Sequence, residues 1–181
     1  MTLPSANFPN GTAARLIEVA LKEIGMIEDG DNLVKYNDRN GQPWCGYFVD
    51  YCLKAAGVKG TPSMVATSIG AHKMKDLGRW IKDKPMIGDL IFFDFLPDQV
   101  DRIQHVGIVA GIKSGSIITI EGNTAPASGS QSNGGMVMIK SRSRIVPTSI
   151  VGFARPKFVA FDGAPPNVTY SDQPIRKKAK K

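Results

Sequence analysis

The chain has 181 residues, of which 42% are apolar and 22% charged, with only 2 Cys and 2 His. This length suits one domain with a buried core, and the apolar content excludes a disordered chain. Two cysteines cannot build a disulfide framework or a four-ligand zinc site, no apolar run approaches a membrane span, and the first ten residues lack the features of a signal peptide.

The formal net charge of +7 is concentrated at the C-terminus, where residues 176–181 (RKKAKK) carry five positive charges. Such a segment favours polyanions in general, among them nucleic acid, anionic lipid and phosphate-bearing wall or envelope polymers. The alternative is a solvated, disordered end. No aromatic residues are interleaved with a basic patch, so specific nucleic-acid binding is not predicted.

Three helices are predicted in the first half of the chain. Apolar residues recur at helical spacing from Ala13 to Ile24, with an N-cap within residues 10–12 and a stop at Gly25. After a polar loop, a second helix is expected from near Cys45 to residue 56, and a third, less regular one over residues 63–77.

The second half predicts strands. Residues 90–95 form a β-rich apolar run, and residues 105–112 and 117–121 flank a turn as a hairpin. Residues 136–139 and 150–154 are further candidate strands, and the Ser/Gly-rich residues 124–135 are expected to form a mobile loop. Helices followed by hairpin-linked strands predict an α+β fold, with the N-terminal helices packed on a central antiparallel sheet.

The two cysteines occupy different positions on the second predicted helix. Cys45 opens it, where free N–H groups and the helix dipole favour a thiolate and can hold an oxyanion. The alternative for Cys45 is a small buried apolar residue. Cys52 lies seven residues on, about 10.5 Å along the axis, which excludes a disulfide between them. We interpret Cys52 as a core residue.

A thiolate nucleophile needs a base, and the chain offers two histidines. His72 lies in a polar part of the third predicted helix, so we place it on the surface. His105 begins a predicted strand, which would hold its imidazole rigidly. The alternative for His105 is an ordinary histidine at a strand end.

The hairpin supplies candidates for a third member. A three-residue turn centred on Ser114 pairs residues whose numbers add up to 228, which places Asn123 opposite His105 and Glu121 diagonally on the same face. A carboxylate or amide there would orient the imidazole. The alternative for Glu121 is a surface carboxylate. The three together suit nucleophilic acyl transfer by a cysteine.

Several segments, in this order, resemble the CHAP domain, the cysteine, histidine-dependent amidohydrolases/peptidases of the wider NlpC/P60 and papain-like group. The resemblance covers roughly residues 12–158 and rests on residues 43–52 (PWCGYFVDYC), 88–93 (GDLIFF), 105–109 (HVGIV), 120–124 (IEGNT) and 152–156 (GFARP). It implies a papain-like α+β fold and a catalytic domain over residues 12–158. Residues 1–11 are then an irregular N-terminus, and residues 159–181 a Pro-rich, then Lys-rich, disordered tail.

The resemblance also implies roles for individual residues. Cys45 would be the nucleophile, His105 the base, Glu121 the orienting carboxylate and Asn123 a supporting polar residue. Many members have Gln directly before the cysteine; this chain has Trp44 there, and Gln42 is the candidate for the second oxyanion donor.

Two aromatic residues near the predicted nucleophile are further candidates. Trp44 and Tyr47, with the loop 124–135, would line the cleft, or else the two aromatics pack the helix. No acidic loop motif indicates the calcium site of some relatives, so no metal ligand and no cofactor are predicted.

The function implied is hydrolysis of an amide bond in peptidoglycan, by an N-acetylmuramoyl-L-alanine amidase or a peptidoglycan endopeptidase. A single catalytic domain without a signal peptide suggests a bacteriophage enzyme made in the host cytoplasm. It would reach the wall as an endolysin released through a holin, or as a tail-associated lysin alongside other tail proteins. The alternatives are a virion structural protein that retains the fold, and a cysteine amidase or peptidase acting on another substrate.

Overall fold

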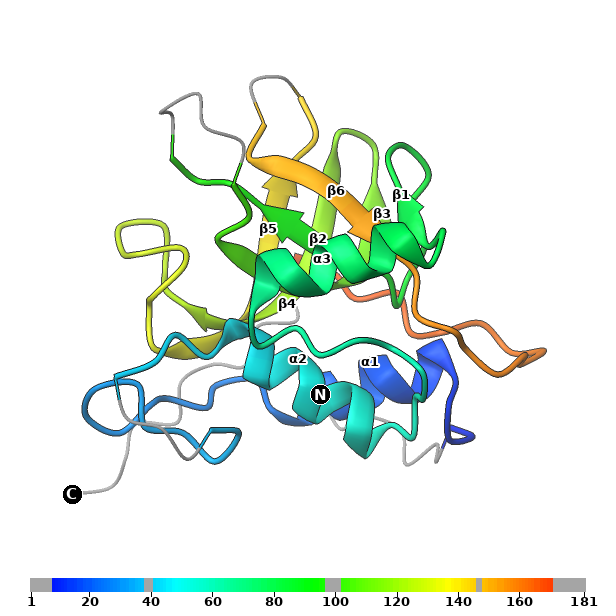
Figure 1. Ribbon diagram of the computed structural model, residues 1–181, viewed down its shortest axis with the longest axis horizontal. Helices are drawn as coiled ribbons and strands as arrows, with labels where there is room; N and C mark the ends of the chain where they lie inside the picture. The colour runs from blue at the N-terminus through cyan, green and yellow to red at the C-terminus, as the bar shows by residue number, and fades with distance from the viewer. Residues whose placement is uncertain (1–7, 38–40, 97–101, 146–147, 171–181) are drawn as a thin grey trace.

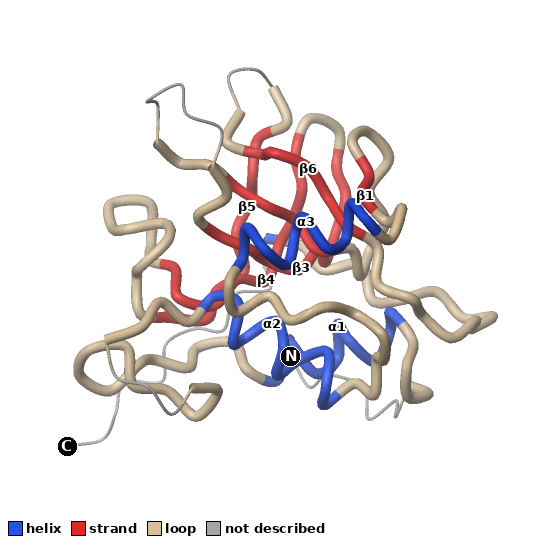
Figure 2. Tube along the Cα trace, in the orientation of Figure 1, coloured by secondary structure: helices blue, strands red, loops and turns tan. Residues whose placement is uncertain are grey.

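The computed structural model describes residues 8–37, 41–96, 102–145 and 148–170. These residues form three helices and one six-stranded sheet (Figures 1 and 2). The helices are α1 (Ala13–Lys22), α2 (Cys45–Ala55) and α3 (Thr67–Asp76). The strands are β1 (Trp80–Ile81), β2 (Leu90–Phe93), β3 (His105–Lys113), β4 (Ser116–Thr124), β5 (Met136–Ser143) and β6 (Ile150–Ala154).

The sheet has the strand order β1-β6-β2-β3-β4-β5, and every neighbouring pair is antiparallel. In Figure 1, α1 and α2 lie together below the sheet and α3 crosses in front of it. Helix α2 contacts β3 and β4, whereas α3 contacts β1 and β6. The predicted α+β architecture is therefore confirmed.

Helices α1 and α2 follow the predicted apolar faces. The side chain of Thr12 accepts a hydrogen bond from the N–H of Arg15 and caps α1. The predicted apolar residues of α2 are buried, and the chain turns away after the helix at Gly57, whose φ of +72° suits glycine. Helix α2 thus presents its buried face to β3 and β4, and α1 packs against α2.

Helix α3 is shorter than predicted, because it begins at Thr67 and not near residue 63. The carboxylate of Asp50 accepts hydrogen bonds from the hydroxyl of Ser63 (2.6 Å) and the N–H of Met64 (2.8 Å). These bonds hold residues 63–64 in a non-helical conformation against α2. His72 is exposed on α3, as predicted.

The two faces of the sheet carry separate apolar clusters. The larger one contains the buried faces of the three helices together with strand residues such as Phe92, Val106 and Ile108. The smaller one, on the opposite face, contains Phe93 and Val109 among others. The second cluster matters for the site, because the rings of Phe93 and His105 lie 5.9 Å apart.

The β3–β4 hairpin has the predicted register near Ile108, but its turn is shorter than predicted. The turn has two residues, not three, so Lys113 pairs with Ser116 and the paired numbers near the turn add up to 229. An irregularity between Val109 and Gly111 then shifts the register, and Ile108 pairs with Ile120, numbers that add up to 228. The bulge therefore restores the face on which Glu121 can meet His105.

The predicted start of a disordered tail at residue 159 is wrong for residues 159–170. The N–H of Val159 donates to the carbonyl of Gly11, and the N–H of Val168 donates to the carbonyl of Ala110, both at 2.8 Å. Val168 is buried, because Gly111 has no side chain to prevent its approach to the bulge. The Lys-rich residues 176–181 lie outside the described residues.

At the other end, residues 8–11 contain no helix or strand, and residues 1–7 lie outside the described residues. Among the described helices, none has the length and apolar character needed to cross a membrane.

Candidate active site

Three elements that are far apart in the sequence bring the predicted nucleophile, base and carboxylate together. Cys45 is the first residue of α2, His105 the first residue of β3, and Glu121 lies in β4. Nε2 of His105 lies 3.1 Å from Oε2 of Glu121. The other ring nitrogen, Nδ1, is buried without a hydrogen-bond partner among the described residues, so it is the nitrogen left to face the sulfur.

The surroundings of Cys45 favour a thiolate. Burial raises the pKa of its thiol, but the adjacent His105 imidazolium, the N–H of Val106 and the hydroxyl of Thr67 together lower that pKa below its ordinary value. The first N–H groups of α2 also have no partner within the helix. They are the donors that an oxyanion formed at Cys45 would meet.

His105 and Cys45 stabilise each other's charged forms. Burial lowers the pKa of His105, whereas the adjacent Cys45 thiolate and the Glu121 carboxylate raise it to about 9. Both side chains are nearly inaccessible, with relative exposures of 3% for Cys45 and 0% for His105. The surroundings of the two buried side chains therefore favour a thiolate–imidazolium pair.

Glu121 is held by more partners than the sequence indicated. Its carboxylate accepts hydrogen bonds from the hydroxyl of Thr119 (2.5 Å) and from Nε (2.8 Å) and Nη2 of Arg142. Burial raises the pKa of Glu121, but the hydrogen bonds from Arg142 and His105 lower it to about 2. Glu121 is therefore an ionised carboxylate although it is fully buried.

Arg142 was not among the predicted site residues, because the predicted strand ended at Ile139, whereas β5 continues to Ser143. The alternation of Met138, Lys140 and Arg142 along the strand is the sequence feature that places Arg142 on the face of Glu121. Met138 pairs with Glu121, and in a strand every second residue lies on the same face.

Asn123 lies in β4 as expected, but its hydrogen bonds do not lead to His105. Its φ of +56° interrupts the alternation of the strand. Its amide donates to Oδ1 of Asn133 (3.1 Å), and its Oδ1 accepts from the N–H of Gly135 (3.3 Å). The described hydrogen bonds of Asn123 thus tie it to the loop after β4.

The candidate substrate-binding residues differ in their exposure. Trp44 is fully buried, and its Nε1 donates to Oε2 of Glu28 at 2.8 Å, so its interpretation as a cleft residue is wrong and it packs the helix instead. Tyr47 is partly buried against the main cluster, and Gln42 is exposed. Roles for Tyr47 and Gln42 in binding stay predictions.

Three comparisons place the chain among known proteins. Residues 37–123 match the family model of the CHAP domain, and a search of curated proteins found no match. Among solved structures, one match is a protein similar to a lipoprotein, of the NLP/P60 family, from Staphylococcus aureus. It has 17% sequence identity and a TM-score of 0.45, and the alignment covers 86% of this chain.

The chain covers 45% of the length of that staphylococcal protein. The family match spans Cys45, His105 and Glu121, the residues that converge in the structure. CHAP domains are generally cysteine- and histidine-dependent amidohydrolases. Residues 37–123, which hold the three converging residues, are therefore similar to the CHAP domain family.

Proposed function

We propose that the protein hydrolyses an amide bond in peptidoglycan through an acyl-enzyme on Cys45. The proposal rests on one observation, the buried contact series from Cys45 at the start of α2 through His105 of β3 to Glu121 of β4. A thiolate paired with an imidazolium is the reactive form of a cysteine hydrolase.

The reaction has two halves. The Cys45 thiolate attacks the amide carbonyl, the N–H groups of α2 stabilise the oxyanion, and His105 gives its proton to the nitrogen as the C–N bond breaks. Water then attacks the thioester and loses a proton to His105, and the C–S bond breaks. The thiolate is regenerated, and the products are one amine and one carboxylic acid.

A groove of about 670 Å³ is a candidate for the substrate-binding site. Its lining includes Ser68 and Ile103, which are close in sequence to Thr67 and His105, and the hydroxyl of Ser68 donates to the carbonyl of Ile103 at 3.0 Å. Lys75 also lines the groove. Lys75 and Arg102 outnumber Asp94, the acidic residue of this lining, and two cations suit the carboxylates of peptidoglycan stem peptides.

The test is digestion of purified peptidoglycan by the full chain, with mass spectrometry of the released muropeptides. We expect new amino groups, sensitivity to iodoacetamide and no release by Cys45→Ala. The mass of the products identifies the bond, which separates an amidase from an endopeptidase. Release of muropeptides by Cys45→Ala at the wild-type rate would refute the mechanism. If Cys45 of the wild type reacts with iodoacetamide but no muropeptides are released, peptidoglycan is not the substrate.

We infer a bacteriophage lysin, acting either after release through a holin or as part of a virion tail. Lysis of cells by the protein applied from outside, and its detection in purified virions by mass spectrometry, distinguish these two. Presence in virions together with an inactive Cys45 site would favour the structural alternative.

A further inference from the structure

Arg142 connects the carboxylate of the candidate active site to the outer strand β5. We propose that Arg142 is a positioning residue, which keeps Glu121 ionised and oriented toward His105 and thereby maintains the reactive form of Cys45. The part of this inference that concerns catalysis rests on the proposed function. The part that concerns the state of the thiol does not.

The contact between Arg142 and Glu121 has two points. Nε of Arg142 donates to Oε1 at 2.8 Å, and Nη2 donates to Oε2, the oxygen that also lies 3.1 Å from Nε2 of His105. The side chain of Glu121 is fully buried and that of Arg142 is 10% exposed. A two-point contact fixes the plane of the carboxylate, which a single bond from His105 would leave free to rotate.

The plane of Arg142 is itself fixed by aromatic rings. Its guanidinium lies over Phe93 and Phe95, at 5.1 and 5.0 Å from their centroids. The same two rings lie 5.9 and 5.8 Å from the imidazole of His105. A lysine supplies the charge but neither the planar stacking nor the two-point contact.

The charges that face Glu121 come from two neighbouring strands. His105 faces it from β3, Arg142 and Lys140 face it from β5, and the hydroxyl of Thr119 from its own strand donates to it. Cys45 lies beyond His105 on α2. Without Arg142, burial would favour the neutral form of Glu121.

A neutral Glu121 would no longer favour the imidazolium of His105. The Cys45 thiolate would then lose its counter-ion, and the pKa of the thiol would rise, because burial alone raises it. Loss of Arg142 is thus expected to shift the reactivity of Cys45 to higher pH, although Arg142 makes no described hydrogen bond to Cys45.

Arg142 also contacts the loop after β4, which has to be separated from its effect on charge. Nη1 of Arg142 donates to Oε1 of Gln131 at 3.0 Å, and Nε2 of Gln131 donates to the carbonyl of Gly129 at 2.8 Å. Gln131→Met removes the contact with the loop and leaves the contact between Arg142 and Glu121. It is therefore the matched control.

The experiment measures the rate at which iodoacetamide alkylates Cys45 in the full chain as a function of pH, with the modified residue located by peptide mass spectrometry. On its acid side the alkylation rate falls as Cys45 becomes protonated, and we call this part of the profile the acid limb. For Arg142→Met we expect the midpoint of the acid limb to move to higher pH by about 1–2 units. Arg142→Lys should give a smaller rise and Gln131→Met none. In a Glu121→Gln background, Arg142→Met should add no further shift.

The proposal would be overturned if the acid limb of Arg142→Met had its midpoint at the wild-type pH. It would also be overturned if Arg142→Met shifted the acid limb of Glu121→Gln as far as it shifts that of the wild type. If Arg142→Met does not fold, Arg142→Lys decides, because an unchanged acid limb in that variant also overturns it. The assay uses no wall substrate. A failure of the wild type to digest peptidoglycan would therefore refute the proposed function and leave this result standing.

Discussion

The two cysteines of α2 give the clearest comparison within the molecule. They lie seven residues apart on one helix, and both are nearly inaccessible, at 3% exposure for Cys45 and 0% for Cys52. The pKa of Cys45 is lowered, whereas burial and the nearby Glu23 carboxylate raise that of Cys52 well above its ordinary value. Burial is therefore not what distinguishes a reactive thiol from an inert one.

The difference lies in what reaches each sulfur. Cys45 stands at the start of the helix, where His105 and Val106 arrive from β3 and Thr67 from α3. Cys52 lies in the interior of the helix among the residues of the main apolar cluster. The fold distinguishes two similar cysteines by bringing a cation and hydrogen-bond donors to Cys45, and these favour its thiolate.

The largest effect is expected for His105→Ala, which should make Cys45 resemble Cys52. Without the imidazolium, burial raises the pKa of the Cys45 thiol, so alkylation at neutral pH should be lost and hydrolysis should fall at least about 10³-fold. Digestion assays and peptide mapping test this. His72→Ala, at the exposed histidine of α3, is the control and should behave as wild type.

Glu121→Gln should have the next largest effect. It keeps the shape of the side chain but removes the charge that stabilises the imidazolium, so the rate should fall about 10²–10⁴-fold. The wild-type rate should decline above the pKa of His105, about 9, where the imidazole loses the proton that the leaving amine needs. We call this decline the alkaline limb of the pH profile. In Glu121→Gln the alkaline limb should lie at lower pH, because the carboxylate that raises the pKa of His105 is lost.

Glu23→Gln tests whether any buried carboxylate would have the same effect. Glu23 is buried near Cys52 and accepts a hydrogen bond from Tyr36 at 2.6 Å, away from His105. Its loss should lower the melting temperature but leave the alkaline limb in place. An alkaline limb that moves equally in both variants would contradict the role assigned to Glu121.

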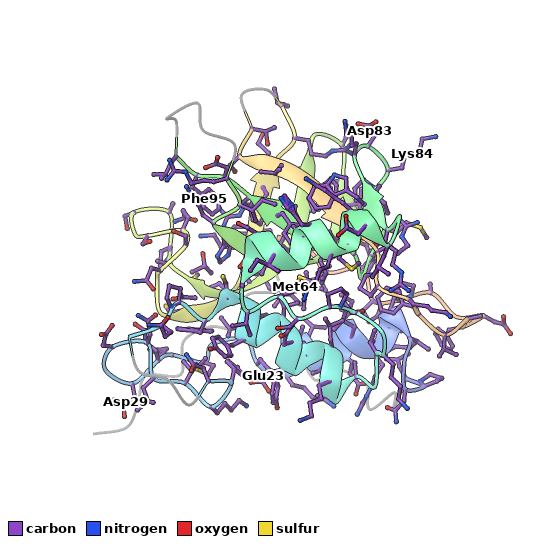
Figure 3. All side chains as sticks on the ribbon, viewed as in Figure 1. Glu23, Asp29, Met64, Asp83, Lys84 and Phe95 are labelled. Atoms are coloured by element: carbon purple, nitrogen blue, oxygen red, sulfur yellow. The ribbon has the colours of Figure 1, made fainter. Side chains whose placement is uncertain are left out.

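Gly46→Ala tests how closely the start of α2 must approach its neighbours. A Cβ there would lie 1.9 Å from the carbonyl oxygen of Met64, a residue that Figure 3 labels on the segment between α2 and α3. We expect a loss of about 2–3 kcal/mol of unfolding free energy, although alanine is the better helix former. Thermal denaturation measures it, and Lys54→Ala, on the exposed face of α2, should show almost no loss.

Cys52→Ala should have the smallest effect on activity, namely none. Truncating this buried side chain should cost about 1–2 kcal/mol of unfolding free energy, seen by denaturant titration. Hydrolysis at saturating substrate should stay at the wild-type rate. A loss of hydrolysis in a folded Cys52→Ala protein would mean that the two cysteines are not as different as the structure indicates.

The sequence predicted those parts of the molecule that follow from local patterns. The starts of α1 and α2, the hairpin and the exposure of His72 follow from capping residues, apolar periodicity and polar neighbours. The meeting of His105 and Glu121 was also predicted, although a two-residue turn and the bulge near Gly111 jointly produce the register that one longer turn was expected to give.

Long-range packing accounts for what the sequence did not predict. Nothing local shows that Arg142 of β5 reaches Glu121 of β4, that Trp44 donates to Glu28, or that Val168 bonds to the bulge of β3. The positive φ of Asn123 likewise breaks an alternation that an ideal strand would keep. Each depends on segments that the chain brings together only when folded.

The most direct test is the pH dependence of alkylation of both cysteines in the native wild-type protein, read residue by residue by mass spectrometry. Cys45 is expected to react with iodoacetamide below neutral pH, and Cys52 is expected to stay unmodified until the protein unfolds. Equal rates at the two positions, or a Cys45 that reacts only at alkaline pH, would contradict a thiolate held by His105.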